Sequence, residues 1–375
     1  MKQNAPRIVI AAGTGFLGRA LVVHLQRAGY ACVILTRSPN PDSATPEIYW
    51  DGRTLGDWTQ QLEGAVAVIN LAGRSVNCRY HKKNRALILD SRVETTRAIG
   101  QAIARCKNPP AAWLNASTAT IYKHTFGPAW TETGEIGATP EAKDAFSIEV
   151  ATAWERTFNE MPTPHTRKVA LRAAMVLGSG KNSVFPVLKR LVRFGLGGKI
   201  ADGRQFVSWI HEIDFCRAVE WLITHPKIAG PVNLAAPHPL TNADMMKALR
   251  ATYHVPIGLP ATRWMLEIGT VLLRTESELV IKSRRVVPGK LLDAGFQFQF
   301  PDFQVAAKDL TAVPRRSAGG QPDSDRIAFA SECGRPGHCN VQLTKVEKLL
   351  RAPGRFQIAA PETGALRPKK TKNLK

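Results

Sequence analysis

The chain has 375 residues, of which 44% are hydrophobic and 22% charged, which excludes general disorder and is typical of a globular protein with a core and a second lobe. The formal net charge of +21 is spread along the chain, because residues 311–375 carry 13 Lys and Arg against 5 Asp and Glu and the first 310 carry 38 against 25. No run approaches about 18 apolar residues and no nucleic-acid-binding signature is present, so we expect neither a membrane span nor specific nucleic-acid binding. The positive charge is compatible with non-specific attraction to polyanions or with an anionic small-molecule substrate.

Short apolar runs alternate with helical patterns through the first 175 residues. Helices are predicted over Phe16–Ala28, which Gly29 ends, and Lys83–Cys106, which Pro109-Pro110 ends. The predicted strands are continuous apolar runs of the kind buried on both faces: Arg7–Ala11, Ala31–Thr36, Ala65–Asn70, Trp113–Ala116 and Lys168–Ala173. This alternation predicts an α/β fold, a Rossmann-type doubly wound parallel sheet. The polar start before the first strand favours a cytoplasmic protein.

Beyond Ala174 the pattern changes to a helix, a Gly-rich loop and a strand that ends at His211. Thr241 and Asp244 form a predicted capping box for a helix that ends near Thr252. We expect a smaller C-terminal substrate lobe. The predicted division is residues 1–240 for the Rossmann domain with inserted lobe segments, 241–310 for a small C-terminal domain, and 311–375 for a mostly disordered basic tail with one helix near 341–350.

Six cysteines are scattered through the chain, which favours isolated thiols over a disulfide framework. Cys333, His338 and Cys339 lie close together in the tail. Three such ligands without a fourth at zinc-like spacing predict no metal site.

The most specific motif is a glycine loop between the first strand and the first helix. Gly13, Thr14, Gly15, Phe16, Leu17 and Gly18 follow the strand directly. In this context backbone N–H groups and the positive end of the helix dipole bind the phosphates of a dinucleotide. About twenty residues later, Thr36 and Arg37 stand where NAD enzymes carry an acidic residue, and a cation with hydroxyls suits the 2′-phosphate of NADP(H).

Several motifs in order resemble the epimerase family of extended short-chain dehydrogenases/reductases, in the group of unassigned substrate. They are GTGFLG, Trp50-Asp51, LEGAVAVINLAGRSV, SRVETTRAI, LRAAMVLG and SWIHEIDF, and Glu276–Pro301 is similar to the domain of unknown function (DUF1731) that closes these proteins. The resemblance covers about Arg7–Leu310. It implies an NADP(H)-type Rossmann domain, with Leu71, Ala72 and Gly73 beside the cofactor and Ala173 near the nicotinamide.

Two departures from the wider superfamily affect the expected reaction. Ser147 and Ala151 stand where ordinary members place the Tyr and Lys of the proton-transfer pair, a loss that the resembled group shares. Val207 stands where nucleotide-sugar epimerases place an Arg for the diphosphate, which disfavours a UDP-sugar, although Arg204 lies nearby. Ala12 replaces the first glycine of the usual loop, at a place where a positive φ favours glycine.

The remaining candidates for chemistry are hydroxyls and one histidine. The resemblance implies that Thr118 or Ser117 hydrogen-bonds the reacting carbonyl or hydroxyl, and His211, followed by Asp214, is a candidate proton-transfer group. For Tyr122 a packed ring is favoured over chemistry. The expected function is hydride transfer between NADP(H) and an unidentified small molecule. The alternative is a non-catalytic NADP(H)-binding redox sensor that acts through a protein partner.

Overall fold

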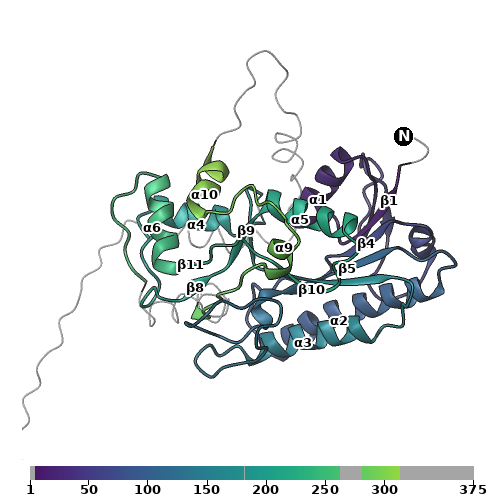
Figure 1. The fold of residues 1–375 in the computed structure, drawn as a ribbon, viewed down its shortest axis with the longest axis horizontal. Coiled ribbons are helices and arrows are strands. Elements are labelled where there is room, and N and C mark those ends of the chain that lie inside the picture. The colour runs from purple at the N-terminus through teal and green to yellow at the C-terminus, as the bar shows by residue number, and fades with distance from the viewer. Residues whose placement is uncertain (1–4, 181, 262–280, 313–375) are drawn as a thin grey trace, which may run out of the picture. The chain divides into compact units, whose positions relative to one another are not determined.

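The computed structural model describes residues 5–180, 182–261 and 281–312. Its main element is a seven-stranded sheet with the order β10-β6-β5-β4-β1-β2-β3, in which all neighbouring strands are parallel (Figure 1). The strands are β1 (Arg7–Ala11), β2 (Ala31–Thr36), β3 (Glu47–Tyr49), β4 (Ala67–Asn70), β5 (Ala112–Thr118), β6 (Arg167–Ala173) and β10 (Gly230–Leu234). The Rossmann-type doubly wound parallel sheet that the sequence predicts is therefore confirmed.

Helices cover both faces of this sheet, which explains why its strands are apolar on both sides. One face packs against α1 (Phe16–Arg27), α5 (Glu212–Thr224) and the short α9 (Gly289–Asp293). The other face packs against the 3₁₀ helix η1 (Asp57–Leu62), α2 (Lys82–Arg105) and α3 (Ala145–Glu160) (Figure 1). Successive side chains of β1 alternate between the two faces of the sheet. Ile8 and Ile10 pack on the face that α1 covers, and Val9 and Ala11 pack on the face that α2 covers.

The strand order reverses at β1, since the chain continues to β2 and β3 on one side and to β4, β5, β6 and β10 on the other. Such a reversal opens a crevice beyond the carboxyl ends of the strands, where open α/β sheets bind their ligands. The fold thus selects one edge of the sheet for the site.

A second core lies beyond the main sheet. The described elements that form it are β7 (Met175–Leu177) with β9 (Trp209–His211), β8 (Phe206–Val207) with β11 (Leu240–Thr241), α4 (Phe185–Arg193), α6 (Asn242–Thr252) and α10 (Phe303–Thr311). The segment 281–312 contributes to both regions, since α9 packs on the main sheet and α10 belongs to this core. Ser208 Oγ donates to the Arg284 carbonyl at 2.9 Å and accepts from Val286 N–H at 2.7 Å. The lobe is thus built from segments on both sides of residue 240.

The predicted elements agree closely in the first half of the chain. The bounds of β1 and β2 are as predicted, and β4, β5 and β6 differ from prediction by one or two residues at an end. Thr241 caps α6 as predicted, because its Oγ1 accepts from Asp244 N–H at 3.1 Å and α6 ends at Thr252. The second half differs from a capping box, since Asp244 Oδ2 accepts from the Thr241 hydroxyl at 2.6 Å. The predicted tail boundary falls one residue inside α10, whose last residue is Thr311. The predicted helix at 341–350 and the Cys333, His338 and Cys339 group lie outside the described residues.

Within the described ranges, no helix combines the length and the apolar character needed to cross a bilayer. The same ranges contain no group of three or more His, Cys, Asp or Glu side chains arranged to hold a metal ion. Cys32, Cys106 and Cys216 are free thiols, and burial raises the pKa of Cys32 to about 12.

Candidate functional site

The glycine loop lies between β1 and α1, at the carboxyl edge of the sheet. Ala12 has φ 58°, the left-handed conformation that glycine adopts without strain. Its N–H donates to the Leu35 carbonyl of β2 at 2.8 Å and its carbonyl accepts from Gly15 N–H at 3.4 Å. The turn therefore keeps a positive φ although alanine replaces the usual glycine.

The start of α1 is open to an anion. Gly15 is its N-cap and provides no side-chain cap, and the first turn carries no acidic residue. A Cβ at Gly15 would meet only the Ala12 carbonyl, at 3.7 Å, whereas a Cβ at Gly18 would overlap the Gly13 backbone. Gly18 thus brings the helix against the loop and Gly15 leaves the N–H groups accessible, which fits a dinucleotide diphosphate.

The other residues of the predicted loop have different surroundings. Thr14 accepts through its carbonyl from Arg19 Nε at 2.9 Å. Leu17 packs into the core under α1, and the Phe16 ring lies against Gly178, where a Cβ would overlap it. These side chains hold the loop in place, while its backbone offers the donors.

Thr36 and Arg37 mark the carboxyl end of β2. Thr36 is buried, and its Oγ1 accepts from Ser38 N–H at 3.4 Å. Arg37 is exposed. This strand end therefore carries an exposed cation beside a buried hydroxyl.

The turn after β4 is anchored by a buried amide cluster. Asn70 Oδ1 accepts from Ala72 N–H at 3.0 Å, and Asn70 Nδ2 donates to Asn115 Oδ1 at 2.7 Å on the neighbouring β5. Leu71 N–H donates to the Ala11 carbonyl of β1 at 3.1 Å. Gly73 follows and is exposed. The predicted turn of Leu71, Ala72 and Gly73 is therefore held directly beside the glycine loop.

Ser117, near the end of β5, belongs to a buried charged network. Its Oγ donates to Glu155 Oε1 at 2.5 Å. Both oxygens of Glu155 accept from Arg172, at 2.8 Å from Nε and 2.7 Å from Nη2, and both side chains are almost fully buried. Paired charges of this kind satisfy each other's buried groups. The Ser117 proton is thus engaged by a carboxylate, which sequence reasoning did not foresee.

Thr118 is the last residue of β5 and has a different role. Its Oγ1 accepts from Thr120 N–H at 3.1 Å and so caps the 3₁₀ helix η2 (Ala119–Ile121). The residue is partly buried and pairs in register with Ala173 of β6. Since the oxygen accepts from the amide, the hydroxyl hydrogen remains available to another acceptor.

Tyr122 is packed, as the sequence favoured. Its hydroxyl donates to Asn233 Oδ1 at 2.8 Å and accepts from Arg172 Nη1 at 2.8 Å. Burial raises the pKa of this phenol, against the opposing influence of Arg172. A phenol with a raised pKa and two buried partners is a structural group here.

A lysine from the C-terminal segment enters the same region. Lys282 Nζ lies 2.5 Å from Asp144 Oδ2 and donates to the Thr120 carbonyl at 2.6 Å. Both side chains are 1% exposed. Lys282 therefore joins the start of α3 to the helix that Thr118 caps. The long sequence separation gave no signal for this contact.

His211 is a buried helix cap. Its Nδ1 accepts from Ile213 N–H at 3.1 Å at the start of α5. Its ring stacks on the Phe300 ring, with 4.0 Å between the ring centroids, and its Nε2 lies 3.3 Å from the Asp309 carboxylate. The residue is 1% exposed. Asp214, which we expected to orient it, instead accepts from the Gln299 and Phe300 amides and from Arg217. These contacts give His211 a structural role, and its catalytic role stays a prediction.

The two positions of the missing proton-transfer pair also differ in surroundings. Ala151 is fully buried in an apolar cluster with Ile121, Tyr122 and Val286, whereas Ser147 is partly exposed. No ionisable group fits at Ala151 without replacing that packing. Arg204, the possible substitute beside Val207, is exposed and pairs with Asp202 at 2.9 Å.

All predicted cofactor residues and both candidate hydroxyls lie at the carboxyl ends of β1, β2, β4, β5 and β6, which are neighbours in one sheet. His211 does not, because it ends β9 in the second core. This shared edge is the one where open α/β sheets bind their ligands.

Two family models match this chain. The model described as NAD dependent epimerase/dehydratase family matches residues 8–235, and the one described as domain of unknown function (DUF1731) matches residues 261–310. Among curated proteins, the epimerase family protein SDR39U1 of Bos taurus is 30% identical over 310 residues, which cover 82% of this chain and 100% of that protein. The epimerase family protein YfhF of Bacillus subtilis is 30% identical over 306 residues, which cover 81% of this chain and 98% of that protein.

Solved structures agree with the fold. Human epimerase family protein SDR39U1 (isoform 2), crystallised with NADPH, is 26% identical, has a TM-score of 0.70 and covers 81% of this chain and 98% of its own. The UDP-N-acetylglucosamine 4-epimerase of Bacillus cereus has a TM-score of 0.65 at 20% identity, and the match covers 82% of this chain and 98% of that one. At that identity the second likeness concerns the fold alone.

Proposed function

The chain belongs to the NAD-dependent epimerase/dehydratase family, and from this premise we propose that it transfers hydride between NADP(H) and a small molecule. One observation carries the proposal: the glycine loop opens onto a helix start without acidic residues, and the cation Arg37 follows the neighbouring strand. The NADPH in the similar human structure supports the same choice of cofactor.

In this proposal the residues divide the work by position. Backbone N–H groups of the Gly13–Gly18 loop hold the diphosphate, and Thr36 with Arg37 holds the 2′-phosphate. Bound NADP(H) supplies or accepts the hydride. Thr118 donates its hydroxyl hydrogen to the reacting oxygen of the substrate, because its own oxygen accepts from Thr120 N–H. Ser117 is less suited, since its hydrogen is donated to Glu155.

The test of the cofactor assignment is a pair of titrations. NADPH should bind at least about tenfold more tightly than NADH, which corresponds to about 1.4 kcal/mol, because Arg37 favours the extra phosphate. Arg37→Asp should remove or reverse that ratio. Arg97→Asp, at an exposed position of α2, makes the same charge change and should leave the ratio unaltered. Equal affinities of the natural protein for the two cofactors would contradict the assignment.

The second candidate function is a redox sensor that binds NADP(H) without turnover. Ala151 favours it, because a buried apolar cluster occupies the place of the usual catalytic lysine. A screen of metabolite mixtures that follows NADPH absorbance separates the two functions. Turnover with any mixture supports the enzyme, whereas tight NADPH binding with no turnover supports the sensor.

A further inference from the structure

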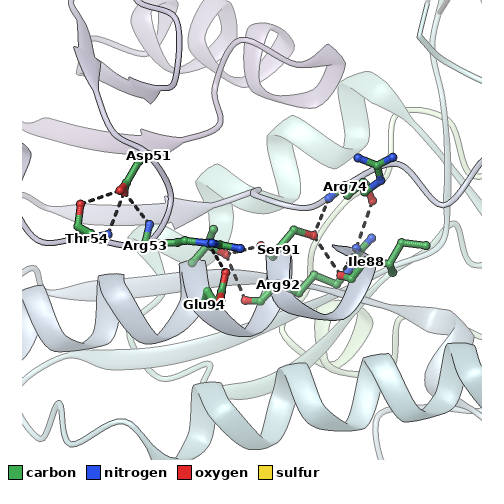
Figure 2. A network of polar contacts seen from close by, with 9 residues as sticks. Asp51, Arg53, Thr54, Arg74, Ile88, Ser91, Arg92 and Glu94 are labelled. Atoms are coloured by element: carbon green, nitrogen blue, oxygen red, sulfur yellow. Dashed lines mark hydrogen bonds and ion pairs between the residues drawn. The ribbon is translucent and has the colours of Figure 1, made fainter. Parts of the chain in front are cut away.

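A small polar network ties the turn after β4 to helix α2. Arg74 N–H donates to Ser91 Oγ at 2.9 Å, and Ser91 Oγ donates to the Ile88 carbonyl at 3.0 Å. Arg92 Nη1 donates to the carbonyls of Arg74, at 3.2 Å, and Ile88, at 2.9 Å (Figure 2). The Arg92 guanidinium is therefore anchored to the same turn that carries Leu71, Ala72 and Gly73.

The guanidinium is held between Gly73 and an aromatic ring. A Cβ at Gly73 would lie 3.3 Å from Arg92 Cζ and 3.4 Å from Nη2. Arg92 Cζ lies 5.1 Å from the centroid of the Trp154 ring on α3. This cation–π contact and the two carbonyls orient the group before any ligand arrives.

No carboxylate of the described residues lies within ion-pair distance of Arg92. Glu94, two residues along α2, pairs with Arg53 at 2.5 Å (Figure 2). Asp51 accepts from the backbone N–H groups of Arg53 and Thr54. Partial burial lowers the pKa of Arg92 to about 10, against the opposing influence of Tyr80. The cation remains charged at neutral pH, but nothing described here neutralises it.

Arg92 and Arg172 differ in how their guanidinium groups are partnered. Arg172 receives a two-point contact from Glu155, whereas the hydrogen bonds of Arg92 use Nη1 only. A guanidinium has five N–H donors, so Nε and Nη2 of Arg92 keep donors for a ligand. A partly buried cation with spare, preoriented donors is suited to a two-point contact with an oxyanion.

We propose that Arg92 binds an oxyanion of the substrate, a carboxylate or a phosphate. The proposal rests on the function proposed above. β4 and β5 are parallel neighbours, so the turn that anchors Arg92 and the hydroxyl of Thr118 leave the sheet at the same edge. In this proposal Arg92 holds the charged end of the substrate, while the Thr118 hydroxyl donates to its reacting oxygen.

Two anionic probes and one neutral probe test this assignment on the full-length protein saturated with NADPH. Binding of acetate, methyl phosphate and acetamide is followed by ligand-observed NMR, and NADPH affinity is measured separately by fluorescence. Saturation with NADPH removes any contribution from the phosphate sites of the cofactor. The anion that binds with the higher affinity identifies the oxyanion that the site takes. Acetamide should bind measurably neither to the natural protein nor to the Arg92 variants.

Arg92→Gln should weaken binding of the preferred anion at least tenfold, and NADPH affinity should change less than about threefold. Arg92→Lys keeps the charge without the planar guanidinium, so its affinity for the preferred anion should lie between those of the natural protein and Arg92→Gln. It also provides a folded comparison if the glutamine variant is unstable. Arg97→Gln, an exposed position on the same helix, is the matched control and should bind the anion as the natural protein does.

Three results would overturn the proposal. Anion binding that is equal in the natural protein and in Arg92→Gln removes the residue from the site, and so does a natural protein that binds neither anion. A tenfold loss of NADPH affinity in Arg92→Gln assigns the residue to the cofactor instead. Failure of the proposed function itself is distinct, because the natural protein would then either not bind NADPH or bind it without turnover of any metabolite mixture, whatever the result with the anionic probes.

Discussion

At the scale of single residues, Ala12 illustrates a local conflict that the fold overrides. Alanine has a φ of 58° here because the turn between β1 and α1 requires a left-handed residue. That conformation costs a residue with a Cβ roughly 1–2 kcal/mol relative to glycine. The hydrogen bonds of Ala12 with Leu35 and Gly15 hold the turn in spite of this cost.

Replacing Ala12 with glycine should therefore stabilise the protein. The relief of strain exceeds the extra entropy of glycine in the unfolded chain, and we expect a net gain of about 0.5–1 kcal/mol. The urea midpoint measures it, and NADPH affinity should be retained because the backbone path is unchanged. A lower midpoint for Ala12→Gly would mean that the methyl group contributes packing beyond this account.

The neighbouring hydroxyls of β5 should respond differently to removal. Ser117→Ala deletes a buried hydrogen bond to the Glu155 carboxylate and should cost about 1.5–3 kcal/mol of unfolding free energy. Thr118→Val should lower kcat for any activity found by about 10² or more, with NADPH affinity nearly unchanged. Urea unfolding and turnover assays on both variants provide the comparison. If Ser117→Ala abolished turnover in a protein of undiminished stability, the roles assigned to the two residues would be reversed.

At the scale of elements, the start of α5 explains why His211 resembles a catalytic residue in sequence. It follows an apolar strand and precedes an acidic residue, a pattern also typical of proton-transfer groups. In the structure its Nδ1 serves as the cap of α5 and Asp214 faces the Gln299 and Phe300 amides. The pattern arises because a helix start needs an acceptor and favours negative charge in its first turn.

A pair of substitutions distinguishes a cap from a proton-transfer group. His211→Ala removes the cap and the stack on Phe300 and should cost about 2–4 kcal/mol. His211→Asn restores a side-chain acceptor for Ile213 N–H, so it should recover about 1 kcal/mol of that loss. Thermal or urea unfolding of both variants measures the difference. Asparagine and alanine variants of equal stability would argue against the cap.

At the scale of the whole molecule, the described residues beyond 240, which are 241–261 and 281–312, are integrated with the domain before them. Lys282 binds Asp144 and the Thr120 carbonyl, and Asp309 lies against His211. Phe300, Phe303 and Ala306 belong to the same core as Trp209 and Met245. The second lobe therefore cannot be removed at the predicted domain boundary without exposing apolar surface and separating buried charges.

Two truncations should have opposite results. Removal of residues 313–375 cuts just after α10 and should leave a folded protein that binds NADPH, since the removed sequence begins with a Pro- and Gly-rich stretch and ends in a basic one. Removal of residues 259–375 deletes α10 and Lys282 and should give an insoluble or unfolded product. Circular dichroism and an NADPH titration provide the readout, and loss of NADPH binding in the shorter deletion would place the boundary further along the chain.

The sequence by itself determined the Rossmann sheet, the glycine loop, the turn after β4 and the family, because each depends on a local pattern of apolar runs, glycines and strand ends. The carboxyl edge as the location of the site followed from the parallel order of those strands.

Only the tertiary structure decided how the polar side chains are partnered. Ser117 with Glu155, Lys282 with Asp144, and Arg92 with the carbonyls of the turn join residues from different elements, and His211 is a cap because of what packs around it. The physical reason is that the chemistry of a polar group depends on its burial and its partners, and packing brings those partners together from distant parts of the chain.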